Sequence, residues 1–117
     1  CGKIIDLAGK NVRTLNRCDC GGAIRPDVVW FGESLPLGTI NEAFETAQNC
    51  DLMFSIGTSA QIYPAAQLPI EAQNRGAFVI EINPEPTPFS PLADMSVRDD
   101  AGSALPKFYK DFHAQLK

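Results

Sequence analysis

Residues 50–66, CDLMFSIGTSAQIYPAA, carry the pattern that best indicates how this chain folds. The apolar run Leu52–Ile56 predicts a short β-strand. The small and hydroxyl-bearing residues Gly57-Thr58-Ser59 predict a turn, and Pro64 suits the first turn of a helix, where the N–H that proline lacks would be unbonded. The stretch therefore predicts a strand, a polar loop and a helix in succession.

The same alternation of short apolar runs and longer amphipathic segments extends along the chain from Asp27 onward. The expected strands are Val28–Phe31, Leu52–Ile56, Phe78–Ile82 and Met95–Val97, and the expected helices are Thr39–Asn49, Pro64–Arg75 and Leu105–Leu116. Because strands and helices alternate, we expect an α/β fold with a largely parallel sheet.

The ends of these elements carry residues that favour helix boundaries and turns. Thr39 can cap the first helix, with Glu42 three residues later as its capping-box partner. Gly76 can end the second helix with a positive φ, and Pro106 is expected in the first turn of the last helix. The proline-rich stretch 84–91 cannot continue a central strand, so we expect a loop there.

The chain has 117 residues, of which 44% are hydrophobic and 21% charged, and this is the size and composition of one globular domain. The formal net charge is −4 and the basic residues are scattered, so we expect no direct nucleic-acid partner. The longest purely apolar runs have four residues, far fewer than the roughly 20 that span a bilayer, so we expect no membrane segment. Because the first residue is Cys1 rather than Met, we also expect that sequence is missing upstream.

Polar or small residues follow three successive expected strands. Gly57-Thr58-Ser59 offers hydroxyls for phosphate or ribose oxygens, Asn83 and Glu85 can hydrogen-bond ribose hydroxyls, and the stretch 99–103 is small enough to lie against an adenine. Ligands of open parallel sheets bind outside the carboxyl ends of the strands, so the three stretches together suggest one nucleotide site. The alternative is that each is only a turn or a helix cap, and no G-x-G-x-x-G fingerprint is present.

Three of the four cysteines lie in residues 1–26, which we interpret as part of a small zinc-binding module. Sixteen residues separate Cys1 from the close pair Cys18 and Cys20, and zinc ribbons place two such pairs roughly 15–20 residues apart. Free thiols are the alternative. A zinc site of thiolates indicates a reducing setting, so we expect a cytoplasmic protein. Cys50, at the end of an expected helix, is best explained as a small core residue.

The stretch Asp27–Glu33 is the third candidate site. It places the aromatic residues Trp30 and Phe31 beside Gly32, whose backbone another chain can approach closely. An exposed strand of this kind can bind an extended peptide by strand addition, and core packing is the alternative.

Five stretches of the sequence stand out as a set: CDCGG, IRPDVVWFGE, CDLMFSIGTSAQIYPAA, GAFVIEIN and DDAGSALP. In this order they closely resemble the C-terminal half of a sirtuin, a family of NAD-dependent protein-lysine deacylases, and the resemblance extends from Cys1 to about Phe112. The tryptophan in VVWFGE and the tyrosine in YPAA are most similar to the class III group. The resemblance implies a partial zinc-ribbon module at 1–26, followed at 27–117 by the C-terminal part of a Rossmann-like NAD-binding domain.

The resemblance assigns roles to individual residues. Residues implied to contact NAD are Gly57, Thr58, Ser59, Asn83, Pro84, Glu85 and Ala101. Residues implied to bind the acyl-lysine peptide are Val29, Phe31, Gly32 and Glu33, with Tyr63 opposite them. Cys18 and Cys20 match the second pair of zinc ligands, and Cys1 matches one member of the first.

The implied activity is removal of an acyl group, acetyl or succinyl, from lysine with transfer to ADP-ribose. The family's Gly-Ala-Gly and Gln-Asn-Ile-Asp segments and its catalytic histidine do not occur here, and His113 in the last helix is expected to be solvated or capping. We therefore expect no catalytic residue and no activity from this chain alone. Expected partners are an acylated lysine protein and the missing N-terminal half or a second copy. The alternatives are a non-catalytic module that binds ADP-ribose or a peptide, and a zinc-stapled structural domain.

Overall fold

The computed structural model describes residues 1–6, 8 and 17–115. The chain divides into two compact units, Cys1–Leu35 and Pro36–Lys117, and each is described by itself. No helix in the described part of the chain is both long enough and apolar enough to cross a membrane.

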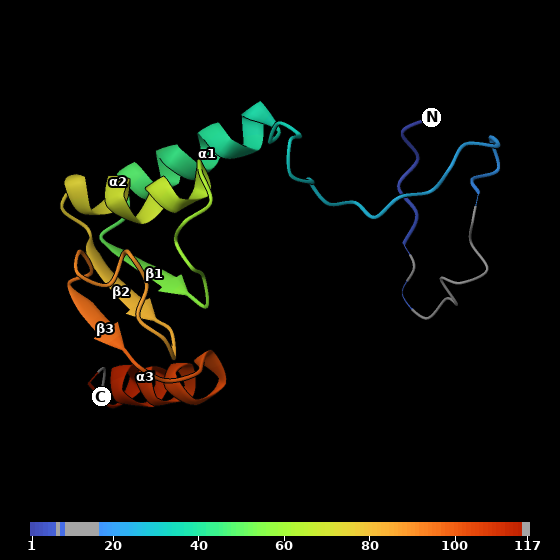
Figure 1. The fold of residues 1–117 in the computed structure, drawn as a ribbon. Helices are drawn as coiled ribbons and strands as arrows, with labels where there is room; N and C mark the ends of the chain where they lie inside the picture. The colour runs from blue at the N-terminus through green and yellow to red at the C-terminus, as the bar shows by residue number, and fades with distance from the viewer. Residues whose placement is uncertain (7, 9–16, 116–117) are drawn as a thin grey trace. The chain divides into compact units, whose positions relative to one another are not determined.

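The second unit is built on a three-stranded sheet whose strands are all parallel, in the order β1-β2-β3 (Figure 1). The strands are β1 (Leu52–Ile56), β2 (Phe78–Ile82) and β3 (Met95–Val97). Their bounds and parallel arrangement are those predicted from the sequence. The carboxyl-terminal residues are in register, with Ile82 of β2 opposite Ile56 on one side and Val97 on the other.

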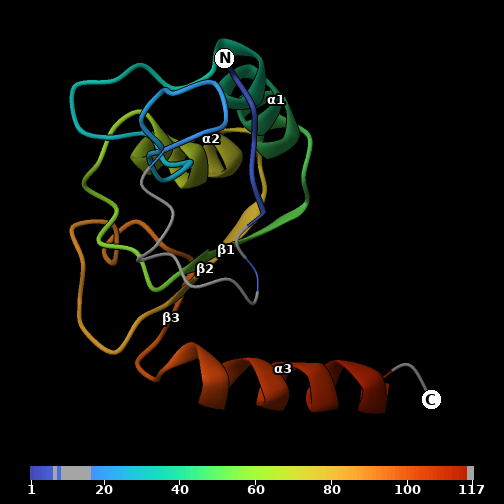
Figure 2. The same cartoon turned by 90° about the vertical axis from the view of Figure 1, so that its right-hand side faces the viewer.

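Helices cover both faces of the sheet. They are α1 (Leu37–Gln48), the short 3₁₀ helix η2 (Ala65–Gln67), α2 (Leu68–Asn74) and α3 (Ala101–Gln115). Figure 2 shows α1 and α2 over one face and α3 over the other, the same arrangement as in Figure 1. The fold of this unit is therefore α/β, as expected.

The core consists of two clusters, one on each face of the sheet. Val79 of β2 packs with residues of α1 and α2 on one face, where it is fully buried. Ile80 and Ile82 pack on the other face against Ala104 and Phe108 of α3. β2 is central in the sheet, so its side chains are buried on both faces, as is usual for parallel strands.

The predicted starts of all three helices are wrong. The second helix was expected to begin at Pro64, but Pro64 precedes the 3₁₀ helix η2, and α2 begins only at Leu68. The capping box of Thr39 and Glu42 does not form, because α1 already begins at Leu37. The last helix begins at Ala101 rather than Leu105, because the Asp100 carboxylate accepts hydrogen bonds from the backbone N–H and the hydroxyl of Ser103, at 2.9 and 2.8 Å. Pro106 accordingly lies inside α3 and not in its first turn. Gly76, after α2, has the expected positive φ, at +96°.

The predicted strand Val28–Phe31 is also wrong, because these residues form a loop that ends in a turn. The Glu33 N–H donates to the Trp30 carbonyl at 3.0 Å, and Gly32 inside this turn has a φ of +87°. Among the described residues of the first unit, the only β pairing is the isolated antiparallel bridge between Arg17 and Ala23. Within that described part, the apolar stretch has no neighbouring strand with which it could form a ladder.

Candidate functional site

The residues that follow β1 and β2 lie side by side at the carboxyl edge of the sheet. The Gly57 N–H donates to the Ile82 carbonyl at 2.9 Å, and the Asn83 N–H donates to the Val97 carbonyl at 3.1 Å. The parallel ladder thus continues one residue beyond each strand. Because all three strands are parallel, the predicted nucleotide-binding residues after them share one edge of the sheet.

The side chain of Asn83 joins the first two of these loops. Its Nδ2 donates to the Thr58 carbonyl at 2.9 Å, and its Oδ1 accepts from the Glu85 N–H at 3.2 Å. We predicted that this amide is available to a ribose. The geometry instead uses one of its two N–H groups to hold the loop after β1, which leaves the other N–H for a ligand.

The loop after β1 has an unusual backbone. Gly57 has a φ of +62°, and Ala60 is the one described non-glycine residue with a positive φ, at +51°. The Ala60 N–H donates to the Thr58 hydroxyl at 3.2 Å, which supports this conformation. Thr58 and Ser59 are exposed. Left-handed conformations of non-glycine residues are uncommon and cluster at binding sites, so this loop is a good candidate for ligand contact.

Ala101 is the first residue of α3 and follows β3 after three residues. Its position is fixed by the Asp100 cap, which holds the first turn of the helix. In the strand order, Asn83 stands between Ser59 on the β1 side and Ala101 on the β3 side. The structure therefore brings the three predicted stretches to one edge rather than dispersing them over several faces.

The structure also shows a buried carboxylate in β2, close to the carboxyl edge of the sheet, which the sequence analysis did not single out. Glu81 of β2 is 1% exposed, and its carboxylate accepts hydrogen bonds from the hydroxyls of Thr87, Ser90 and Ser96. It also pairs with Arg98, whose Nη1 lies 2.7 Å from Oε2. Burial raises the pKa of Glu81, but the hydroxyls of Thr87 and Ser90 together with Arg98 outweigh it and hold the pKa below its usual value.

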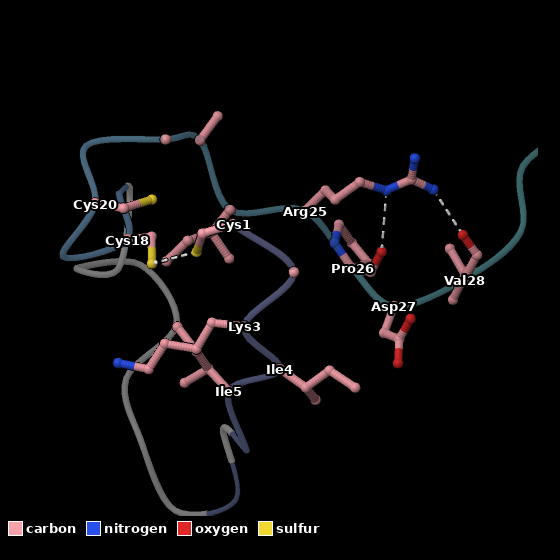
Figure 3. Close-up of a pocket in the computed structure, with 14 residues that line it drawn as sticks. Cys1, Lys3, Ile4, Ile5, Cys18, Cys20, Arg25, Pro26, Asp27 and Val28 are labelled. Carbon is pink, nitrogen blue, oxygen red and sulfur yellow. Dashed lines mark hydrogen bonds between the residues drawn. The ribbon is translucent and has the colours of Figure 1, made fainter.

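The first unit brings three cysteines together (Figure 3). The sulfur atoms of Cys1, Cys18 and Cys20 all lie within 4.8 Å of one another, and those of Cys1 and Cys18 are 3.7 Å apart. Ligand sulfurs about 2.3 Å from a tetrahedral zinc ion lie about 3.8 Å from each other, whereas a disulfide requires about 2.05 Å. The observed spacing therefore fits a metal site and not a disulfide.

A tight turn positions the close cysteine pair. The Cys18 N–H donates to the Gly22 carbonyl at 2.9 Å, and the Gly21 N–H donates to the Cys18 carbonyl at 2.8 Å. Hydrogen bonds from the backbone N–H and then the side chain of Cys20 lower the pKa of the Cys18 thiol, and Lys3 adds to the effect. A lowered pKa favours the thiolate, which is the form that binds metal. Cys50, in contrast, packs against the core cluster that contains Val79, and its thiol donates to the Ala47 carbonyl at 3.3 Å.

The predicted peptide-binding loop is held by one ion pair. The Arg25 guanidinium binds the Glu33 carboxylate through two hydrogen bonds of 2.6 and 2.9 Å, donates to the Val28 carbonyl at 2.7 Å, and lies 4.4 Å from the centre of the Trp30 ring. Arg25, followed by the Trp30 backbone N–H, lowers the pKa of Glu33 to about 2. Glu33 therefore fixes the shape of the loop. The sequence signal for this ion pair was the presence of opposite charges, Arg25 and Glu33, at the two ends of the loop.

The remaining residues of the predicted peptide site are exposed. Phe31 is 92% exposed and Val29 is 44% exposed, both in the first unit. Tyr63 of the second unit is 68% exposed and precedes Pro64. The position of Tyr63 opposite the loop stays a prediction.

Comparison with known proteins identifies the class to which this fold and these sites belong. Residues 3–64 match the model of the Sir2 family. An NAD-dependent protein deacylase of Mycobacterium tuberculosis (strain H37Rv) is 53% identical over 100 residues, which are 86% of this chain and 42% of that protein. The chain therefore belongs to the Sir2 family, and it spans about two fifths of the length of this relative.

Solved structures agree with this assignment. A Sir2 homologue in complex with NAD superposes with a TM-score of 0.82 and 41% identity, covering 86% of this chain and 40% of that one. Sir2Tm bound to a propionylated peptide superposes with a TM-score of 0.78 and 30% identity, covering 87% of this chain and 46% of that one. The chain is thus similar in structure to part of two ligand-bound Sir2 proteins.

Proposed function

We propose that this chain is the part of an NAD-dependent protein-lysine deacylase that forms one wall of the NAD site, the acyl-peptide-binding loop and part of a zinc module. One observation carries the proposal. The loops after three successive parallel strands share one edge of the sheet, in a chain 53% identical to an NAD-dependent protein deacylase.

The edge of the sheet is the proposed NAD site. Thr58 and Ser59 offer exposed hydroxyls to the phosphates and a ribose, and Gly57 lets the backbone approach them closely. The turn Asn83–Glu85 binds the adenine ribose, and the backbone of Ala101 meets the adenine. The NAD complex of a Sir2 homologue with a TM-score of 0.82 to this chain supports these roles.

The loop of residues 29–33 is the proposed peptide site. Val29 and Phe31 are exposed, and the pairing of Arg25 with Glu33 gives the loop a defined shape in the absence of peptide. An extended acyl-lysine peptide would add to this loop as a strand, with Gly32 allowing close approach. The similarity to Sir2Tm bound to a propionylated peptide supports this role.

Cys1, Cys18 and Cys20 are the proposed zinc ligands. Their sulfur spacing fits a tetrahedral thiolate site, and zinc bound there would stabilise the first unit without taking part in the reaction. The reaction itself needs a base that we assign to the rest of the enzyme. His113 is exposed on α3, 4.3 Å from the ring centre of Tyr109, and we give it no catalytic role.

Calorimetric titration with ADP-ribose tests the proposal in the complete gene product that carries this chain. Each hydrogen bond lost at the site is expected to cost about 0.5–1.5 kcal/mol, so the double variant Ser59→Ala, Asn83→Ala should bind roughly fivefold to a hundredfold more weakly. The matched control is Asn49→Ala, because Asn49 follows α1 and precedes the amino end of β1. Affinity for ADP-ribose that survives the double substitution would overturn the proposed site.

Deacylation is measured in parallel with NAD and acetylated or succinylated lysine peptides. The complete gene product is expected to release nicotinamide only when both NAD and an acylated peptide are present. This chain expressed alone is expected to release none, because the proposal assigns the base to the missing part. Acyl transfer by the isolated chain would contradict that division of roles.

A further inference from the structure

Glu81 is a charged residue in the middle of an otherwise apolar central strand. Its side chain is 2% exposed, and its neighbours Ile80 and Ile82 both belong to the core. A buried carboxylate is costly unless it is paired and hydrogen-bonded, and a well-packed apolar residue is often at least as stabilising in such a position. Stability alone therefore does not account for a glutamate here.

The partner of Glu81 connects it to the carboxyl edge of the sheet. The same Arg98 Nη1 that lies 2.7 Å from the Glu81 carboxylate also donates to the carbonyls of Asn83 and Glu85, each at 3.3 Å. One nitrogen atom thus connects the buried carboxylate to the backbone carbonyls of the two residues on either side of Pro84. The side chain of Arg98 is 34% exposed.

Three further hydrogen bonds, all from hydroxyl groups, hold the Glu81 carboxylate in place. The hydroxyls of Ser90 and Ser96 donate to Glu81 Oε2 at 2.7 and 3.3 Å, and the hydroxyl of Thr87 donates to Oε1. These residues come from the loop after β2 and from β3. The carboxylate therefore has little freedom, and Arg98 is held with it.

The connection continues from the turn to the loop after β1. The backbone carbonyl of Asn83 accepts from Arg98, and the side-chain amide of Asn83 donates to the Thr58 carbonyl. Glu81, Arg98, the Asn83–Glu85 turn and the loop at Thr58 are therefore linked in one chain of contacts. Displacing Arg98 would release the turn and, through Asn83, loosen the neighbouring loop.

We infer that Glu81 and Arg98 are positioning residues that hold the Asn83–Glu85 turn in the conformation that recognises the hydroxyls of the adenosine ribose. The inference rests on the proposed function, because it needs the nucleotide to bind at this edge. Neither residue has to touch the ligand. Their main effect falls on the ribose hydroxyls, because Arg98 contacts the Asn83–Glu85 turn directly and reaches the loop at Thr58 only through Asn83.

The test is a binding comparison between ADP-ribose and an analogue that lacks the 2′- and 3′-hydroxyls of the adenosine ribose, by calorimetry on the complete gene product. The parent protein is expected to prefer ADP-ribose by roughly tenfold. In Arg98→Gln the preference is expected to fall below about threefold, because the turn no longer presents its polar groups in a fixed arrangement. Arg98→Lys retains a cation that can donate to the same oxygens, and most of the preference should return.

Two further variants separate positioning from folding and from charge. Glu81→Gln keeps the hydroxyl partners but loses the ion pair with Arg98, so it should also lose the preference. Arg75→Gln removes an exposed arginine that pairs with Glu71 at 3.7 Å and precedes the amino end of β2, so it should keep the preference. Thermal unfolding shows which variants are folded, and if Arg98→Gln is not, Glu81→Gln and Arg98→Lys carry the comparison.

The outcomes distinguish this inference from the proposed function. If the parent protein binds ADP-ribose with the expected preference and a folded Arg98→Gln or Glu81→Gln keeps that preference, the positioning role is overturned and the nucleotide site stands. Equal weakening of both ligands would show that Arg98 acts on the phosphates, directly or through the loop at Thr58, and not on the ribose hydroxyls, which also overturns it. If the parent protein binds neither ligand, the proposed function fails and the inference fails with it.

Discussion

The side-chain amide of Asn83 donates to the backbone carbonyl of Thr58 at 2.9 Å, across the gap between the loops that follow β1 and β2. Two loops that both face the proposed nucleotide are thereby joined by a side chain, in addition to the backbone bond from Gly57 to Ile82. The arrangement makes Asn83 important to the site even where its amide does not contact the ligand.

Asn83→Ala is expected to weaken ADP-ribose binding more than the loss of one ligand contact would. The substitution removes the bond to Thr58 and the bond from the Glu85 N–H, and each is worth about 0.5–1.5 kcal/mol. Asn83→Asp keeps the acceptor for Glu85 but replaces the donor to Thr58 with a negative charge, so it should be at least as harmful. Calorimetric titration measures both, and an affinity unchanged in Asn83→Ala would contradict the role given to this amide.

The ion pair of Arg25 and Glu33 predicts an unusually acidic carboxyl group. The pKa of Glu33 is lowered from 4.5 to about 2, chiefly by Arg25. Because the folded-state pKa is the lower one, the stabilisation from this group is present above pH 4.5 and is lost as the pH falls through about 2. The pair is exposed, so the expected change in overall stability is small.

Carbon-13 NMR of the glutamate carboxyl groups measures this titration directly. Glu33 should titrate near 2 in the parent chain and at a distinctly higher pH, towards 4.5, in Arg25→Gln, whereas Arg75→Gln should leave it unchanged. Trp30 is the one tryptophan of the chain and lies 4.4 Å from the guanidinium of Arg25, so its fluorescence should follow the same titration. A Glu33 midpoint near 4.5 in the parent chain would mean that the ion pair does not form in solution.

The cysteine cluster predicts a zinc content that depends on three of the four cysteines. The complete gene product should purify with about one zinc ion per chain, and Cys18→Ser or Cys20→Ser should lose most of it. Cys50→Ser is the matched control, because Cys50 lies in the other unit and packs against the core cluster that contains Val79. Elemental analysis by mass spectrometry gives the stoichiometry, and full zinc retention in both Cys18→Ser and Cys20→Ser would rule out these ligands.

The sheet was predictable because local signals agreed. Each of the runs Leu52–Ile56, Phe78–Ile82 and Met95–Val97 is short, apolar-rich and followed by polar or small residues. The helix between the first two runs favours their parallel pairing, whereas the last two are joined by a loop without a helix. The common edge at which Gly57, Asn83 and Ala101 follow the strands is a consequence of that topology. Sequence reasoning could therefore place the candidate nucleotide site without knowing any contact.

The prediction of a strand at Val28–Phe31 was wrong because apolar residues alone do not form a strand without a pairing partner. The first unit offers no neighbouring strand among its described residues, and Arg25 binds Glu33 across the segment and fixes a turn instead. Phe31, which the pattern placed on a strand, is 92% exposed. The glycine at position 32 and the charge pair around it were the signals that favoured a turn.

The sequence analysis missed the start of α3 and the contacts around Glu81, for different reasons. Asp100 with Ser103 three residues later was a readable cap, but Pro106 was given more weight as a helix start. The contacts of Glu81 with Ser96 and Arg98 join β2 to a segment about 15 residues further along the chain. Such contacts follow from strand pairing and not from local pattern, so no sequence window contains them.

The unpaired outer edge of β1 leads us to expect that this chain associates with another polypeptide chain. β1 is the first strand in the order β1-β2-β3, and its residues Leu52, Phe54 and Ile56 are 48%, 37% and 39% exposed. An unpaired strand edge beside exposed apolar side chains favours pairing with another chain. We expect association with the missing N-terminal half when both are expressed together, and with a second copy when this chain is expressed alone.

Size-exclusion chromatography with light scattering tests this on the isolated chain. Leu52→Lys places a charge on the exposed edge strand and should shift the population towards monomer, because a charged edge disfavours pairing. Leu37→Lys is the matched control, since Leu37 is 76% exposed at the start of α1 and away from the sheet edge. Addition of the separately expressed N-terminal half should replace self-association by a one-to-one complex that Leu52→Lys weakens. A parent chain that elutes as a monodisperse monomer and ignores that half would show that the edge is not an interface.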